Sequence, residues 1–280
     1  MRNPFTFAKL VTTAAVLFLS GSALAHLHTP WLPQGEALRL GTHLVLVRVV
    51  AAGQKAGDGT ETEVLVLAAV DGASPPTGTL RVWQEGAHRH ALEPGALVFL
   101  PLVATPAGGW QYLVESRQPL RTQAAHQAID RTFARTWRAQ PPLELLDHPD
   151  AWLALLDHPA PLARAIALET LAARGPLLRP VMTPERIERL LAPTFEPGTP
   201  EEDRLTRLRL LEGLAGQAGA EAVARRFDRL PGERVRSAAA GLLARFASPT
   251  TRAVLADCAA QAGALGARCT RLIAPSAPAP

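Results

Sequence analysis

The pattern of hydrophobic and polar positions changes near residue 120. Before it, short aliphatic and β-branched runs indicate strands, and the first, at 43–50, is long enough to be a central or bent strand. The Gly-rich, polar stretch 51–60 predicts a mobile hairpin loop after that strand. Further strands are predicted at 63–68, 79–84, 96–102 and 110–115. Five short strands with a glycine-rich first loop predict a small closed or half-open barrel.

Beyond residue 122, alanine, leucine and arginine dominate, and proline or glycine interrupts helical stretches of a few turns. Several stretches begin with proline, which suits the first helical position. The predicted helices are 123–139, 143–146, 150–156, 161–174, 184–191, 200–213, 220–230, 234–246, 250–260 and 264–273. The predicted fold class is α+β with two domains: a small antiparallel β-barrel over 26–120, then an α-helical domain over 121–273. The Pro/Ala/Ser tail 274–280 is predicted to be disordered.

The first 25 residues have the three parts of a signal peptide. Arg2 and Lys9 supply positive charge, 10–19 is apolar, and Ala-Leu-Ala at 23–25 is an A-x-A cleavage site. An apolar run of about ten residues is too short for a transmembrane helix, which needs about 20. Cleavage would leave His26 as the first residue, with no cysteine there for a lipid anchor and no later apolar stretch approaching a membrane span. We therefore expect export to a periplasm or the outside.

Charge argues against a nucleic-acid partner. Arg2 and Lys9 are two of the 29 basic residues, so the mature chain would hold 27 basic and 25 acidic residues. Arginines alternate with acids along the chain, whereas nucleic-acid-binding proteins concentrate basic residues in a patch. The expected export of the chain also argues against a nucleic-acid partner.

The two cysteines, Cys258 and Cys269, lie near the C-terminus. An even number of cysteines in an exported chain indicates a disulfide, because the compartments outside the cytosol are oxidising. A separation of eleven residues matches no CxxC-type redox or metal site. We predict a structural bridge.

Internal repeats are visible in the second half. Three ten-residue segments align, at 162–171, 205–214 and 234–243. The alignment brings three arginines and three leucines into register: Arg164, Arg207 and Arg236, and Leu171, Leu214 and Leu243. The offsets of 43 and 29 residues are irregular but centred near the length of a helical-pair repeat.

The stretch 152–171, WLALLDHPAPLARAIALETL, resembles a HEAT-type repeat. In that family a first helix ends at an Asp-x-Pro-like turn, and a second opens with Val-Arg or Leu-x-Arg before a small residue and leucine. Val235, Arg236 and Ala239 fit the same template. The resemblance implies a HEAT-like solenoid with a concave surface for a partner, and repeat arginines that contact a neighbouring acid or helix C-terminus. The first half resembles an OB-fold or netrin-type barrel in strand number and in its long first strand.

Histidines are the most suggestive polar residues. They form two His-x-His pairs, His26 with His28 and His88 with His90. On an extended backbone such a pair shares one face and could chelate a metal, and neutral imidazole suits copper or zinc. After cleavage, His26 would also offer its free amino group, as in copper histidine-brace proteins. Exposed histidines in a polar turn are the alternative explanation for the second pair.

Catalytic signatures are absent from the sequence: it contains no nucleophile elbow, phosphate loop, HExxH or paired-Cys motif. A duplicated Asp-His-Pro tripeptide, at 147–149 and 157–159, could supply general bases, but its place at repeat boundaries favours a helix stop and turn. We therefore expect a non-enzymatic interaction or scaffold protein with a protein partner and no cofactor. The alternative is a copper- or zinc-binding envelope protein.

Overall fold

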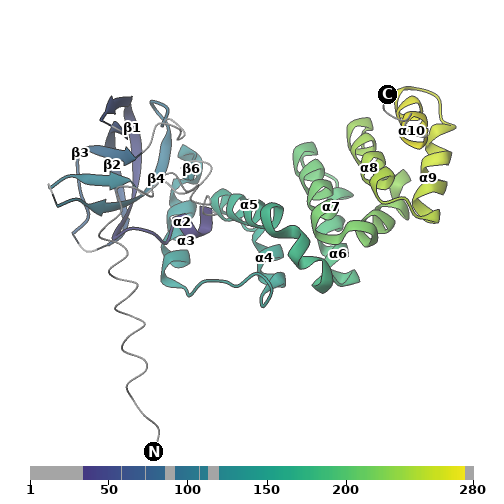
Figure 1. Cartoon of the computed structure of the whole chain (residues 1–280), viewed down its shortest axis with the longest axis horizontal. Coiled ribbons are helices and arrows are strands. Elements are labelled where there is room, and N and C mark those ends of the chain that lie inside the picture. Colours follow the sequence, from purple (N-terminus) through teal and green to yellow (C-terminus); the bar gives the residue numbers. More distant parts are fainter. Residues whose placement is uncertain are drawn as a thin grey trace, which may run out of the picture. The chain divides into compact units, whose positions relative to one another are not determined.

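The computed structural model describes residues 34–57, 59–72, 74–85, 92–106, 108–112 and 120–274. Within them, a closed five-stranded barrel is followed by a helical region (Figure 1), so the predicted α+β class is confirmed. The predicted signal peptide at 1–25 lies outside the described residues, as do residues 275–280 of the predicted tail.

The barrel closes because its first strand pairs on both sides. Its strands are β1 (His43–Ala56), β2 (Gly59–Asp71), β3 (Thr79–Glu85), β4 (Leu97–Ala104) and β5 (Trp110–Tyr112). Their order is β1-β2-β3-β5-β4, and β4 pairs again with β1. All pairings are antiparallel except the one between β3 and β5. A short strand, β6 (Leu120–Thr122), adds to β4 and leads into the helices.

Strand β1 is buried on both faces. Val45, Val47 and Val49 point into the barrel interior, whereas Leu44 and Leu46 belong to a second core that continues among the helices. Alternation along a strand produces this division, since successive side chains point to opposite faces. The barrel and the helical region therefore share a hydrophobic contact surface.

The predicted loop at 51–60 is wrong for most of its length. Strands β1 and β2 continue their pairing to Ala56 and Gly59, with several register irregularities. Gly53 lies within this ribbon, where a Cβ atom would come 2.2 Å from the side chain of Thr60. The glycine therefore marks a close approach of two strands, which the sequence alone does not distinguish from a loop.

The helical region begins with a helix that packs on the barrel. Its helices are α3 (Gln127–Ala139), α4 (Pro149–Leu155), α5 (Pro161–Leu178), α6 (Pro184–Leu191), α7 (Glu201–Ala224), α8 (Glu233–Arg245), α9 (Pro249–Ala259) and α10 (Ala264–Ile273). A one-turn helix, α2 (Gln34–Ala37), precedes β1. The helix predicted at 143–146 is instead an irregular segment ending in a turn, because so short a stretch gains too few backbone hydrogen bonds to offset nucleation.

Two predicted helices, 200–213 and 220–230, form one run with a kink in α7. The backbone of Gly216 has φ 54° and ψ −126°, a conformation that side-chain-bearing residues rarely adopt. Arg179 contacts the helix just before the kink: its Nε donates to the carbonyl of Gly213 at 2.9 Å and its Nη2 to that of Glu212 at 3.4 Å. The arginine thus satisfies carbonyls near a point where the helical pattern is interrupted.

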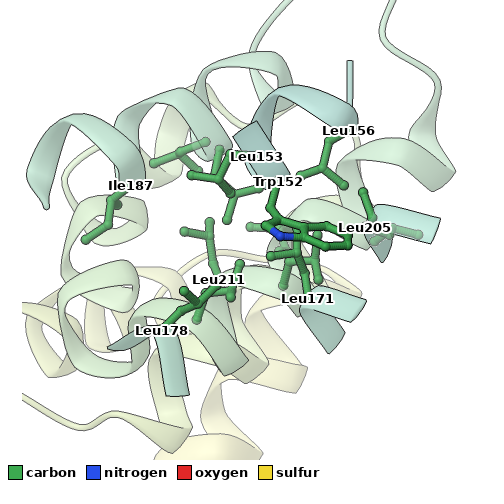
Figure 2. Close-up of a cluster of buried hydrophobic side chains, with 14 of the residues drawn as sticks. Trp152, Leu153, Leu156, Leu171, Leu178, Ile187, Leu205 and Leu211 are labelled. Atoms are coloured by element: carbon green, nitrogen blue, oxygen red, sulfur yellow. The ribbon is translucent and has the colours of Figure 1, made fainter. Parts of the chain in front are cut away.

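The core of the helical region is apolar and continuous. Figure 2 shows side chains from four successive helices and their ends converging in it: Trp152, Leu153, Leu156, Leu171, Leu178, Ile187, Leu205 and Leu211. The indole nitrogen of Trp152 donates to the carbonyl of Leu143 at 3.1 Å, so the buried ring keeps its hydrogen bond. This packing fixes each helix on its neighbours.

Three polar side chains of α3 join the barrel to the helices, and one of them, Arg135, donates from Nε to the carbonyl of Val70 in β2 at 3.0 Å. The buried carboxylate of Asp130 accepts hydrogen bonds from Thr122 Oγ1, at the end of β6, at 2.6 Å, and from the backbone N–H of Leu162, at the start of α5, at 3.0 Å. Arg138 donates to the carbonyls before β1 and to the Asp71 carboxylate at the end of β2.

Cys258 and Cys269 form a disulfide between α9 and α10. These helices end the helical array in the described chain, and α8 precedes them. The bridge therefore fastens the last two helices that the structure describes to each other.

Replacing Cys258 and Cys269 together with serine is expected to destabilise α9 and α10 by about 2 kcal/mol, because the bridge closes a short loop and restricts the unfolded chain. Hydrogen exchange followed by mass spectrometry would show faster exchange in α9 and α10 and unchanged exchange in α4 to α6. Equal loss of protection in all helices would contradict a local role.

Candidate protein-binding surface

The three arginines that the sequence alignment brings into register have three different environments. Arg207 forms an ion pair with Asp157, in the turn before α5. Arg164 donates to the carbonyl of His158 at 3.1 Å, in that same turn. The Nε atom of Arg236 is buried and has no hydrogen-bond partner. The first two contacts stabilise turns and helix boundaries within the fold.

The duplicated Asp-His-Pro tripeptides lie at helix boundaries. Pro149 opens α4, and Pro159 lies in the turn before α5. His158 Nδ1 accepts a hydrogen bond from the backbone N–H of Ala160 at 3.0 Å, and Asp157 pairs with Arg207. The second tripeptide thus makes local turn contacts and an ion pair with α7.

Several ion pairs link neighbouring helices. The ion pairs are Asp150 with Arg186 and Arg189, Glu188 with Arg226, Glu201 and Glu202 with Arg234, and Glu212 with Arg245. The hydrogen bond from Arg186 holds the pKa of Asp150 below its ordinary value, with a smaller contribution from Arg189. These arginines are therefore engaged in holding adjacent helices together.

None of the four predicted metal-binding histidines falls in the described part of the chain: His26, His28, His88 and His90. Among the residues that the structure describes, no group of three or more potential metal ligands comes together. The metal hypothesis therefore stays a prediction from the sequence.

A groove of about 230 Å³ lies between α5 and α7. It is lined by Leu168, Leu171 and Ala172 of α5, and by Thr206, Arg209, Leu210 and Gly213 of α7. Spacings of three and four residues place each set on one side of its helix. Leu171 and Leu210 are buried, whereas Ala172 and Arg209 are exposed. The groove is thus an apolar hollow with one guanidinium group beside it.

Gly213 accounts for the hollow. A Cβ atom built on this glycine would meet nothing within 4 Å. Glycine in the middle of a helix is destabilising by roughly 0.5–1 kcal/mol relative to alanine. Glycine at this position therefore lowers the stability of α7, although neither the backbone conformation nor the space around the Cβ position requires a glycine there.

The aligned positions of α8 carry different residues. In the repeat alignment, Gly213 corresponds to Leu242 of α8, which is 3% exposed. Arg209 corresponds to Ala238, which is partly buried in the core. The part of the groove lined by α7 thus has a glycine and an arginine where the aligned positions of α8 carry a buried leucine and a partly buried alanine. The sequence alignment contained this signal, but only the structure shows that it leaves an open groove.

Comparison with protein-family models and with curated protein sequences finds no match to this chain. In the part of the chain that the structure describes, no helix has both the length and the apolar character needed to cross a membrane.

Proposed function

We propose that this chain is an exported interaction protein that binds a protein partner through the surface around the groove between α5 and α7. The observation that carries the proposal is the groove itself, which has Gly213 and Arg209 in its lining where the aligned positions of α8 are a buried leucine and a partly buried alanine. Departures from locally optimal sequence concentrate at functional sites. Exposed apolar hollows beside polar residues are a common feature of protein-binding surfaces.

Two features of the fold support an interaction module. The strand order, with β3 parallel to β5 and β4 returning to β1, is consistent with an OB-like barrel. The helix pairs that follow, tied by the bond between Asp157 and Arg207, are consistent with HEAT-like repeats. Arrays of this kind present side chains from successive helices to a partner, which agrees with the position of the groove.

Export is supported by the sequence of the first 25 residues and by the disulfide. Structural disulfides persist in secreted and periplasmic proteins and are rare in the cytosol. The partner is therefore expected to be another protein of the envelope or the exterior.

The test places a photo-crosslinking amino acid at Ala172, which is exposed at the groove, and as a matched control at Glu185, which is exposed on α6. In cells that export the protein, irradiation is expected to give a discrete crosslinked protein from position 172 and not from 185. Crosslinking that is equal at the two positions, or absent at both, would count against the proposal.

A further inference from the structure

We infer that the groove between α5 and α7 accepts an aliphatic side chain of the partner, and that an adjacent carboxylate of the partner pairs with Arg209. The inference rests on the proposed function and names the chemistry of the segment that is bound. Three observations lead to it: the volume of the groove, its apolar lining, and the side chain of Arg209, which is the one charged group in that lining.

The volume fits one or two side chains. At about 230 Å³ the groove is smaller than typical small-molecule sites, which measure about 300–1,000 Å³. A cavity of about 150 Å³ lined by aliphatic and aromatic residues is enough to hold benzene. A leucine, isoleucine or methionine side chain therefore matches the space that the missing side chain at Gly213 leaves.

The lining selects an apolar group. Three leucines, one alanine and one glycine line the groove: Leu168, Leu171, Leu210, Ala172 and Gly213. Moving a methylene group from water into such surroundings lowers the free energy in proportion to the apolar area that is buried. A polar side chain would lose hydrogen bonds to water without recovering them in most of the groove.

Arg209 supplies the charge. Its neighbour Arg207 is paired with Asp157, and Arg179 is bound to backbone carbonyls. In the described part of the chain, no hydrogen bond or ion pair engages the side chain of Arg209, which is exposed at the groove. Guanidinium groups recognise carboxylates with well-defined geometry, so an acidic residue next to the aliphatic one is the complementary feature.

The experiment presents random dodecapeptides on phage to the complete mature protein. We expect the selected peptides to combine a leucine, isoleucine or methionine with a neighbouring aspartate or glutamate. Binding of a selected synthetic peptide would then be measured by fluorescence polarisation. Gly213→Leu, which inserts the residue found at the corresponding position of α8, should weaken binding at least about tenfold because it occupies the groove.

Charge variants test the second half of the inference. Arg209→Ala should weaken binding by about three- to tenfold, the range for a partly exposed charge pair. Arg209→Glu should select basic instead of acidic neighbours of the aliphatic residue. Arg252→Ala removes the same charge from an exposed position on α9 and should leave binding unchanged.

Gly213→Ala separates folding from binding, since its added methyl group meets no atom within 4 Å. It should raise the melting temperature and keep most of the affinity. Selected peptides without acids, binding unaffected by Gly213→Leu in a folded variant, or failure to select any peptide would overturn the inference. If crosslinking at Ala172 still yields a partner in that case, the proposed function stands and only the assigned chemistry fails.

Discussion

Replacing Asp130 with alanine is expected to lower the free energy of unfolding by about 3–5 kcal/mol, because one buried and one partly buried hydrogen bond to its carboxylate are lost together. Asp130 is 0% exposed. Its carboxylate caps α5 from a different helix, since the N-cap residue of α5 is Ala160, which makes no side-chain cap. Removing it leaves the N–H of Leu162 and the hydroxyl of Thr122 without this acceptor.

Urea denaturation followed by circular dichroism would measure the effect. Asp130→Asn serves as the control, because an amide oxygen can still accept one hydrogen bond while the Thr122 hydroxyl reorients to accept from the amide nitrogen. We expect Asp130→Asn to lower the free energy of unfolding by less than half as much as Asp130→Ala does. An alanine variant as stable as the wild-type protein would show that Asp130 does not hold β6, α3 and α5 together.

Arg138→Met is expected to cost about 3 kcal/mol at neutral pH, because one charged donor serves several backbone carbonyls and such bonds contribute about 1.5–3 kcal/mol each before solvent exposure is considered. The Arg138 side chain is 10% exposed. It donates to the carbonyls of Leu38, Leu40 and Gly41, which lie in the connection that enters β1. Methionine keeps much of the aliphatic packing and removes the donors.

The pH dependence of this variant can be predicted in sign. The hydrogen bond from Arg138 lowers the pKa of Asp71 from its ordinary value of 3.8. A carboxylate with a lowered pKa in the folded state adds stability that is fully present above pH 3.8 and is lost as the pH falls through the folded-state pKa. The stability difference between the wild-type protein and Arg138→Met should therefore shrink below pH 3.8.

Urea titrations at neutral pH and near pH 3 would measure that difference. Arg131→Met provides a matched control, since Arg131 lies on the same helix and is exposed. Its stability should stay within about 0.5 kcal/mol of the wild-type value, as for most surface substitutions. A difference between the wild-type protein and Arg138→Met that grows toward acid pH would contradict the assigned role of Asp71.

The sequence by itself determined where most helices begin and end. The prediction of 184–191 coincides with α6, and that of 264–273 with α10. Local chemistry explains the first agreement: Thr183 caps α6 and Pro184 occupies its first position, so the start is encoded in adjacent residues. The change from strand to helical periodicity likewise sufficed to predict a barrel followed by helices.

Tertiary structure decided the features that depend on distant contacts. The cap on α5 depends on Asp130 and Leu162, which approach in space although they lie 32 residues apart in the sequence. The groove has the same origin. In the sequence, nothing distinguishes Gly213 from other glycines within a helix. In the structure α5 lies beside α7, and the absence of a side chain at Gly213 leaves open space in the groove that Arg209 also lines. Periodicity records which side of a helix is buried, but whether two such sides fill the space between them depends on packing.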